Sequence, residues 1–354
     1  MSDDIIEAII KDSEPEVKKK QESHKEDVYE KLKPVEPEIK DGYKKFSEVF
    51  GFKPPSGIDH AVPVFDDEDW PEEVRSFIPA EDAEHVWPKK ETEWFVVGLS
   101  HGDRSFLTGP KGSGKSSMPT QVAAKLRIPV MRVNCRADME SSALFGQPSI
   151  EDGTLEWIPG PAEVLGKAGG ILIVDEMTAA PAGISMAMQW MLEKDGKIFL
   201  PDKPSDSGEK FIDPHPWFRV CATDNTVGQG DTTGTYVGAQ VQNEATIDRF
   251  SLTINMDYMR KDQEIKVIKS RVPGLPEQVY KDMVGLAQLV RKSYNQDQIQ
   301  STMSPRSLVN WAEKTKYYGD VMVALRLAYF DKLTEDDQKE VNEYIYKIFA
   351  KKMK

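Results

Sequence analysis

Short apolar runs alternate with longer, mixed segments through the middle of the chain. The runs are rich in Val, Ile, Leu and Phe and cover residues 105–108, 130–135, 171–174, 218–222 and 252–258. The segments between them are long enough for the crossover helices that join parallel strands. The pattern therefore predicts an α/β fold in which helices flank a parallel sheet. In the last run, apolar and polar residues alternate, which predicts a strand with one exposed face near a sheet edge.

The pattern changes on both sides of this region. Residues 94–99 are strand-like in composition, but they stand where a helix should precede the first strand, and we expect a helix there. After about residue 260 the apolar positions follow helical periodicity without strands, and the predicted helices cover 279–291, 305–316, 320–330 and 335–351. We therefore expect an α/β domain over residues 45–258 and an all-α lid domain over residues 259–354.

The amino-terminal residues differ from both domains. Residues 1–44 are dominated by Lys, Glu and Asp, and three prolines interrupt any helix, so we expect a mobile arm. The arm is either a solvated tail with no specific role or a tether that binds a partner through the small apolar patch at residues 5–10. Residues 46–87 contain more aromatic residues together with frequent Pro and Asp, which indicates an irregular segment packed on the main body.

The overall charge indicates which kinds of partner the protein binds. The 354 residues carry a formal net charge of −13, which argues against broad contact with nucleic acid and favours a protein or small-molecule partner. Both cysteines, Cys135 and Cys221, lie in apolar runs, as expected for buried free thiols in a reducing cytoplasm. No run approaches the roughly 18 apolar residues of a membrane span, and the first residues lack the pattern of a signal peptide. We therefore expect a cytoplasmic protein that does not enter the membrane.

A glycine-rich loop follows the first predicted strand and precedes a predicted helix. Its sequence, Gly109-Pro-Lys-Gly-Ser-Gly-Lys-Ser116, has the spacing of a phosphate-binding loop. In such a loop, backbone N–H groups converge on the phosphates, Lys115 reaches the β and γ oxygens, and the Ser116 hydroxyl is a ligand of Mg²⁺. We therefore predict a nucleoside triphosphate and Mg²⁺ as cofactors. The candidate nucleotide-binding residues are Gly109, Pro110, Lys111, Gly112, Ser113, Gly114, Lys115, Ser116 and Ser117.

Polar side chains follow two other predicted strands. Asp175 and Glu176 come directly after a buried run, at the sheet edge where open α/β folds bind ligands. There, Asp175 is a candidate ligand of Mg²⁺ through its water shell, and Glu176 is a candidate base that orients and deprotonates the attacking water. Asn225 follows the run at 218–222, where it could reach the γ-phosphate or that water; the alternative is an Asn that caps a turn.

Two arginines are further candidates. Arg249 stands just before the last predicted strand, and Arg306 opens a lid helix directly after Pro305. An arginine beside a phosphate neutralises charge that develops in the transition state. For either arginine alone, a surface salt bridge is the alternative interpretation.

In this order, the elements at Lys115, Asp175, Asn225, Arg249 and Arg306 resemble those of the AAA+ ATPases. In that family they are called Walker A, Walker B, sensor 1, arginine finger and sensor 2. The resemblance implies that Glu176, Asn225, Arg249 and Arg306 are catalytic. It also implies a homo-oligomeric ring, usually a hexamer, with ATP bound between neighbouring copies.

Finer features narrow the resemblance. Residues 144–161 look like the extra loop in the second helix of the MoxR clade. The stretch 214–250, with its Gly/Thr-rich segment at 228–236, is more similar to the CobS-type ATPases, which are motor subunits of aerobic cobaltochelatase. Residues 46–51 and 304–320 share this similarity, which runs from about residue 45 to the end. CobS-like proteins also occur in phages, and a phage-encoded member would act in the host cytoplasm.

The resemblance leaves the client of such a motor open. In one hypothesis, the ring is a chelatase motor with a CobT-like or von Willebrand factor A type partner. Metal chemistry would then belong to another subunit, because the five histidines here are scattered without ligand spacing. In the other, a MoxR-like chaperone remodels a protein client unrelated to cobalamin synthesis. A nucleotide-dependent scaffold and a nucleic-acid motor are less favoured, because the hydrolytic residues are intact and the chain is acidic.

Two segments are candidates for contact with a client. The loop at 147–161 offers Trp157 as an exposed aromatic residue. Residues 197–212 are typical of a hairpin whose Pro- and Ser-rich tip lies on the surface. The alternative is that both segments pack against neighbouring subunits.

Overall fold

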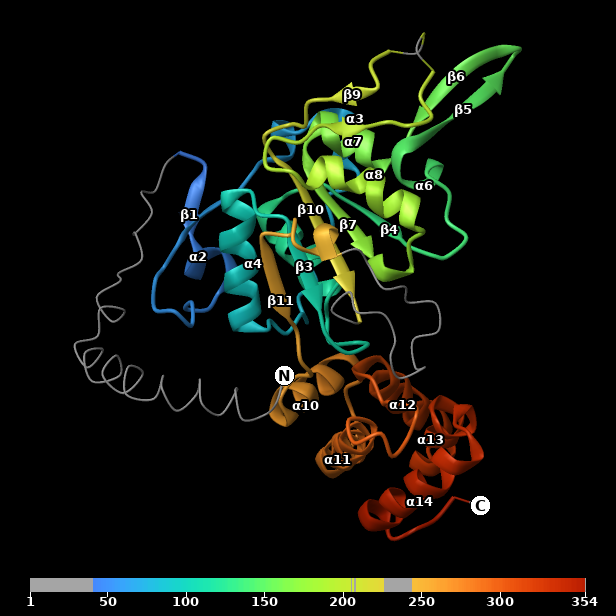
Figure 1. The fold of residues 1–354 in the computed structure, drawn as a ribbon. Helices are drawn as coiled ribbons and strands as arrows, with labels where there is room; N and C mark the ends of the chain where they lie inside the picture. Colours follow the sequence, from blue (N-terminus) through green and yellow to red (C-terminus); the bar gives the residue numbers. More distant parts are fainter. Residues whose placement is uncertain (1–40, 205, 207, 226–243, 354) are drawn as a thin grey trace, which may run out of the picture.

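A five-stranded parallel sheet forms the centre of the larger part of the molecule (Figure 1). The computed structural model describes residues 41–204, 206, 208–225 and 244–353. The strands are β3 (Ser105–Thr108), β4 (Val130–Asn134), β7 (Gly170–Asp175), β10 (Phe218–Asp224) and β11 (Leu252–Asn255), in the spatial order β11-β3-β10-β7-β4. All neighbouring pairs are parallel. The predicted α/β class and the five predicted strands are confirmed.

The inner strands are apolar because helices cover both faces of the sheet. Every residue of β3, β7 and β10 is buried. Helix α4 (Lys89–His101) packs on β3 and β11 and contacts α5 (Ser117–Leu126), whereas α7 (Pro161–Ala168) packs on β4, β7 and β10. Right-handed crossovers place α5 and α7 on opposite faces, because the chain crosses the sheet in opposite directions before and after β4. The helix expected over residues 94–99 is part of α4.

The edge strand β11 behaves as its sequence predicts, but it is shorter. It lies at one end of the strand order, with Ile254 buried and Thr253 and Asn255 exposed. The predicted run extends to residue 258, whereas the strand ends at Asn255. Met256 still donates its N–H to the Thr108 carbonyl at 2.7 Å, and the chain then leaves the sheet toward the helical part.

A short lead-in segment packs on the sheet domain, as its aromatic residues predict. It contains the antiparallel pair β1 (Tyr43–Lys45) and β2 (Ala61–Pro63) and the helices α2 (Phe46–Phe50) and α3 (Glu72–Arg75). Phe46, Phe50 and Trp70 are buried in the same hydrophobic core as the strands. The indole N–H of Trp70 donates to the Arg127 carbonyl at 2.7 Å, which fixes the segment to the end of α5.

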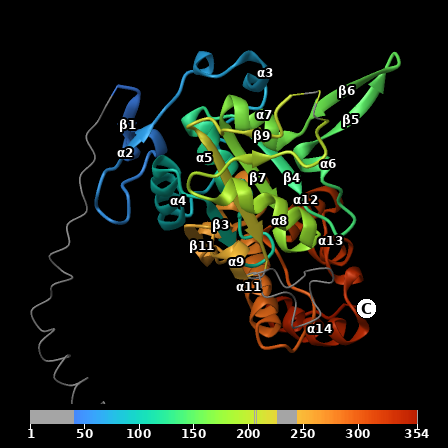
Figure 2. The same ribbon diagram turned by 45° about the horizontal axis from the view of Figure 1, so that its top comes forward.

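Two hairpins extend the sheet domain. After α6 (Ser142–Phe145), β5 (Gly146–Glu151) pairs with β6 (Thr154–Pro159). After α8 (Ala182–Leu192), β8 (Ile198–Phe199) pairs with β9 (Phe211–Ile212), which confirms the hairpin predicted at 197–212. The β5–β6 hairpin projects from the end of the molecule that faces away from α11 and α14 (Figures 1 and 2).

The rest of the described chain, which we call the helical part, has its own hydrophobic core. Its helices are α10 (Lys261–Arg271), α11 (Glu277–Tyr294), α12 (Pro305–Tyr318), α13 (Val321–Ala328) and α14 (Glu335–Phe349). Large buried side chains such as Tyr280 and Trp311 form this core, which is distinct from that of the sheet. The predicted all-α character is confirmed. Helix α10 was not among the predicted helices, since its sequence, KDQEIKVIKSR, has few apolar positions.

Some expectations fall on residues that the structure does not describe. These are almost all of the arm at 1–44 and the Gly/Thr-rich segment at 228–236. The short helix α9 (Glu244–Ile247) follows that segment. Within the described ranges, no helix is both long enough and apolar enough to cross a bilayer.

Candidate functional site

The phosphate-loop sequence joins the end of β3 to the start of α5. Gly109, Gly112 and Gly114 all have positive φ, a conformation that glycine adopts without strain. A Cβ atom at Gly109 would lie 2.0 Å from the Met256 carbonyl oxygen, so only glycine fits between β3 and the chain after β11. The loop and the first turn of α5 together present backbone N–H groups, which is the arrangement that binds phosphate.

Lys115 is buried and bonded to its own loop. Its ammonium group donates to the carbonyls of Gly109 and Pro110, at 2.6 and 2.8 Å, and to Asn225 Oδ1 at 2.9 Å. Burial lowers the pKa of Lys115 to about 8, and the nearby carboxylates of Asp224 and Glu176 oppose this shift. A phosphate oxygen could replace any of these acceptors, because an ammonium group is a strong donor without a fixed partner geometry.

Asp175 lies at the end of β7 and accepts hydrogen bonds from three directions. Ser116 Oγ and Thr223 Oγ1 each donate to its Oδ1 at 2.6 Å, and Arg132 forms an ion pair with its Oδ2. Thr223 reaches it because β10 neighbours β7 in a register that pairs Ala222 with Val174. The carboxylate is only 2% exposed, so these donors hold it in one orientation.

Glu176 and Asn225 complete the carboxyl edge of the sheet. Glu176 is exposed and has φ +53°, which is unusual for a residue other than glycine. Backbone strain of this kind concentrates at functional positions. Asn225 follows β10 and lies beside the phosphate loop, because β10 neighbours β3 in a register that pairs Asp224 with Thr108. Its amide oxygen therefore meets Lys115.

A cleft of about 770 Å³ brings these residues together between the sheet domain and the helical part. This volume falls in the usual range for small-molecule and cofactor sites. The phosphate loop, Asp175, Glu176 and Asn225 line one side, and Tyr258 and Arg306 line the other. Arg306 is exposed, and its positive charge contributes, after burial, to the lowered pKa of Arg132 across the cleft.

Arg249 lies apart from this cleft, unlike Glu176, Asn225 and Arg306. It lies in a second cleft of about 880 Å³ together with Arg104 and Glu193. Arg249 Nε donates to Glu193 Oε1 at 2.6 Å. The chain's own phosphate loop and Arg249 therefore belong to different surfaces of the described structure.

Several residues of the site were not singled out from the sequence, among them Arg132, Thr223 and Tyr258. Arg132 and Thr223 bond to Asp175, and Tyr258 lines the cleft. Arg132 lies within a predicted strand next to β7, so the order of the strands would have been the signal. Local motifs do not carry that information.

The predicted exposure of Trp157 is wrong. Trp157 is half-buried against the sheet core, and its indole N–H donates to Glu163 in α7 at 2.5 Å. Glu163 is itself buried and also pairs with Lys203 at 2.8 Å. The exposed apolar side chains of the β5–β6 hairpin are instead Ile150, Leu155 and Ile158.

The fold and the cleft define the class of protein. The phosphate loop follows β3, which is second in the spatial order β11-β3-β10-β7-β4, and an acidic pair stands at the end of β7. With a helical part across the cleft, these are the elements of an AAA+ P-loop NTPase. A family model described as AAA domain (dynein-related subfamily) matches residues 104–250, and one described as CbbQ/NirQ/NorQ C-terminal matches residues 264–351.

Comparison with known proteins gives the family. The aerobic cobaltochelatase subunit CobS of a Sinorhizobium species is 30% identical over 322 residues, which cover 87% of this chain and 90% of that protein. The chain belongs to the CobS-type, MoxR-like AAA+ ATPases and is an ATP hydrolase.

More distant similarities were also found. The gas vesicle ATPase GvpN1 of Halobacterium salinarum is 26% identical over 244 residues, covering 64% of this chain and 66% of that protein. A solved structure of a Thermotoga maritima RuvB mutant has a TM-score of 0.49 at 12% identity, covering 78% of this chain and 81% of that chain.

Proposed function

We propose that this protein is a Mg-ATP-driven ring motor that remodels a partner protein, in the manner of a cobaltochelatase motor subunit. The observation that carries the proposal is the division of the site between two surfaces. Lys115, Asp175, Glu176 and Arg306 surround one cleft, whereas Arg249 lies in another. A ring in which each copy offers Arg249 to its neighbour's cleft joins the two, and a hexamer is the usual form.

The nucleotide is proposed to bind across the phosphate loop. Residues 109–117 hold the phosphates through backbone N–H groups, and Lys115 exchanges its loop carbonyls for phosphate oxygens. Asn225 keeps a polar contact with Lys115 or the reacting water. Glu176 orients and deprotonates that water, and Arg306 pairs with phosphate from the helical part. The proposed boundary between the sheet domain and the lid lies between residues 258 and 259.

Ser116 and Asp175 fit a magnesium ion. Their hydroxyl and carboxylate oxygens lie 2.6 Å apart at the cleft, and both are hard oxygen ligands. Mg²⁺ in nucleotide sites takes one or two protein ligands and completes its shell with water and phosphate. When bound, the ion would neutralise charge on the phosphates. Arg132 on the second oxygen of Asp175 holds the carboxylate in place.

Arg249 is proposed to act in trans. An arginine supplied by a neighbouring subunit raises the hydrolysis rate by about 10³ to 10⁵. In the single chain, Arg249 is held by Glu193, an exposed ion pair that contributes little and is easily exchanged.

Glu176→Gln tests the proposed base. We expect kcat to fall by about 10² to 10⁴, as for the loss of a general base, while ATP stays bound. The rate of phosphate release from the purified variant measures kcat, and the amount of ATP that stays on the protein measures binding. Glu68 is an exposed carboxylate of the lead-in segment; Glu68→Gln is therefore the matched control, and this variant should hydrolyse ATP normally.

Sedimentation of the Glu176→Gln variant with ATP bound should show assembly of several copies. A monomer at every protein concentration would contradict the ring.

The identity of the partner protein is a further part of the proposal. A CobT-like or von Willebrand factor A type protein is expected for a chelatase motor in the cytoplasm. A MoxR-like chaperone acting on another client is the second candidate, and the exposed Ile150, Leu155 and Ile158 of the projecting hairpin favour it. Capture of proteins on the Glu176→Gln variant distinguishes them: a von Willebrand factor A type partner supports the first, and an unrelated client retained only when Ile150 is intact supports the second.

A further inference from the structure

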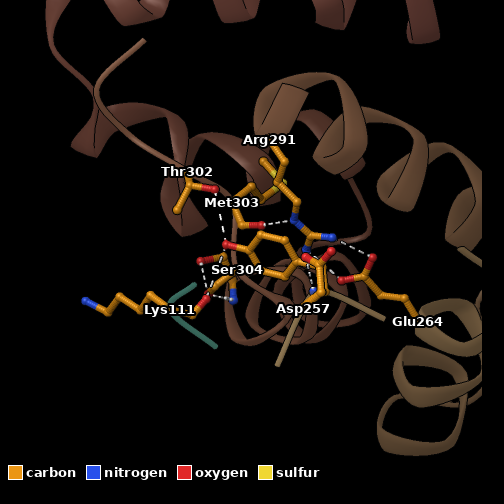
Figure 3. A network of polar contacts seen from close by, with 9 residues as sticks. Lys111, Asp257, Glu264, Arg291, Thr302, Met303 and Ser304 are labelled. Carbon is orange, nitrogen blue, oxygen red and sulfur yellow. Dashed lines mark hydrogen bonds and ion pairs between the residues drawn. The ribbon is translucent and has the colours of Figure 1, made fainter. Parts of the chain in front are cut away.

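A connected set of polar contacts around Tyr258 joins the phosphate loop to the helical part. Figure 3 shows its partners Lys111, Thr302 and Arg291. Tyr258 lies between β11 and α10. Its hydroxyl donates to the Lys111 carbonyl at 3.3 Å and lies 3.3 Å from Thr302 Oγ1. One hydroxyl group therefore contacts both the phosphate loop and the segment that leads into α12.

Arg291 of α11 holds the same segment from the other side. Its guanidinium lies over the Tyr258 ring, 4.0 Å from the centroid, and its Nε donates to the Met303 carbonyl at 2.7 Å. Its two terminal nitrogens donate to Glu264 of α10 at 2.9 and 2.6 Å. The side chains of Arg291 and Glu264 are 7% and 0% exposed. A buried, two-pronged ion pair of this kind fixes the guanidinium plane, so Arg291 is a rigid support for both Tyr258 and Met303.

The segment they hold is the start of α12. Ser304 caps the helix by accepting a hydrogen bond from the Ser307 N–H at 3.2 Å. A Cβ atom at Gly112 would lie 2.9 Å from Ser304 Cβ and 3.1 Å from Pro305 Cδ, so the first turn of α12 rests directly on the phosphate loop. Arg306, the next residue, lines the cleft.

We propose that Tyr258 and Arg291 are positioning residues for ATP hydrolysis, which hold the first turn of α12 against the phosphate loop so that Arg306 reaches the nucleotide of its own chain. The proposal rests on the role of Arg306 proposed above. It assigns to the Tyr258 hydroxyl an effect on the rate of hydrolysis that passes through Arg306, and no effect of its own on nucleotide binding.

A double-mutant cycle of Tyr258→Phe and Arg306→Ala tests this. Tyr258→Phe keeps the ring under Arg291 and removes only the hydroxyl. We expect kcat to fall about fivefold, the factor for one lost hydrogen bond, with KM for ATP changed less than twofold. In the Arg306→Ala background, Tyr258→Phe should cause no further loss. Tyr280→Phe is the control, because in the described part of the chain that hydroxyl hydrogen-bonds to Val272 and Leu275, both within the helical part, and the variant should leave kcat unchanged.

The outcomes separate this inference from the proposed function. If Arg306→Ala hydrolyses ATP normally, the proposed role of Arg306 is wrong. If Arg306→Ala is impaired but Tyr258→Phe is not, or if the two losses multiply, the positioning role is wrong. Titration with a fluorescent ATP analogue checks that each variant is folded; loss of binding in Tyr258→Phe also counts against the inference.

Discussion

The substitution Thr223→Val removes one donor from the buried carboxylate at the centre of the site. Thr223 and Asp175 are each 2% exposed, and their hydrogen bond is 2.6 Å long. A hydrogen bond to a charged group contributes about 1.5–3 kcal/mol, and we expect a loss of about 2 kcal/mol because Ser116 and Arg132 still contact the carboxylate. For a domain of this size, that lowers Tm by about 4–8 °C.

Thr108→Val is the matched control for this prediction. Thr108 is also a buried strand threonine with 2% exposure, but its hydroxyl makes only a 3.4 Å contact with the amide oxygen of Asn255. We expect this variant to lose less than about 1 kcal/mol, as for a weak neutral hydrogen bond. Urea unfolding of both variants without nucleotide gives the two free energies. Equal losses, or a Thr223→Val protein as stable as the unmodified one, would refute the view that Asp175 is held as a charged acceptor.

Three further predictions follow from the site and the core. Burial lowers the pKa of Lys115 to about 8, so in the free protein this residue loses its positive charge as the pH rises through that value; the affinity for ATP should then fall, and a constant Kd from pH 7 to 9.5 would contradict this. Gly112→Ala should reduce hydrolysis at least about tenfold by displacing α12, whereas Gly57→Ala, at nearly the same φ but with open space around it, should only lower stability by about 1–2 kcal/mol; equal hydrolysis rates would count against the contact. Burial raises the pKa of both Cys135 and Cys221, so thiol reagents should label neither before unfolding, and rapid labelling of the native protein would be inconsistent with their burial.

The sheet was predictable because its signal is local. Strands covered on both faces must be apolar along their whole length, and β3, β7 and β10 are. The end of β11 was not predictable in the same way. Residues 256–258 keep the apolar alternation of a strand, but there the Met256 backbone lies against Gly109, and the Tyr258 hydroxyl contacts Lys111 of the phosphate loop and Thr302 of the helical part. Tertiary contacts decide their conformation.

The site was predictable where a motif ends a strand. Lys115, Asp175 and Asn225 meet because β3, β10 and β7 are neighbours: Lys115 lies in the loop after β3, Asp175 ends β7, and Asn225 directly follows β10. Arg132 depends on the register of β4 beside β7, and Tyr258 depends on how the helical part packs on the loop; no local pattern encodes either. The exposure expected for Trp157 followed from its place in a loop, yet a buried carboxylate on α7 accepts its N–H.

Mixing two inactive variants, Arg249→Ala and Lys115→Ala, tests the shared site most directly. Each variant alone should hydrolyse ATP poorly, because every interface lacks one of the two groups. In an equal mixture, half of the copies bring an intact Lys115 and half of their neighbours bring an intact Arg249, so about one quarter of the interfaces are complete. We predict that the mixture regains up to about this fraction of the unmodified rate. No recovery at any mixing ratio would contradict the account.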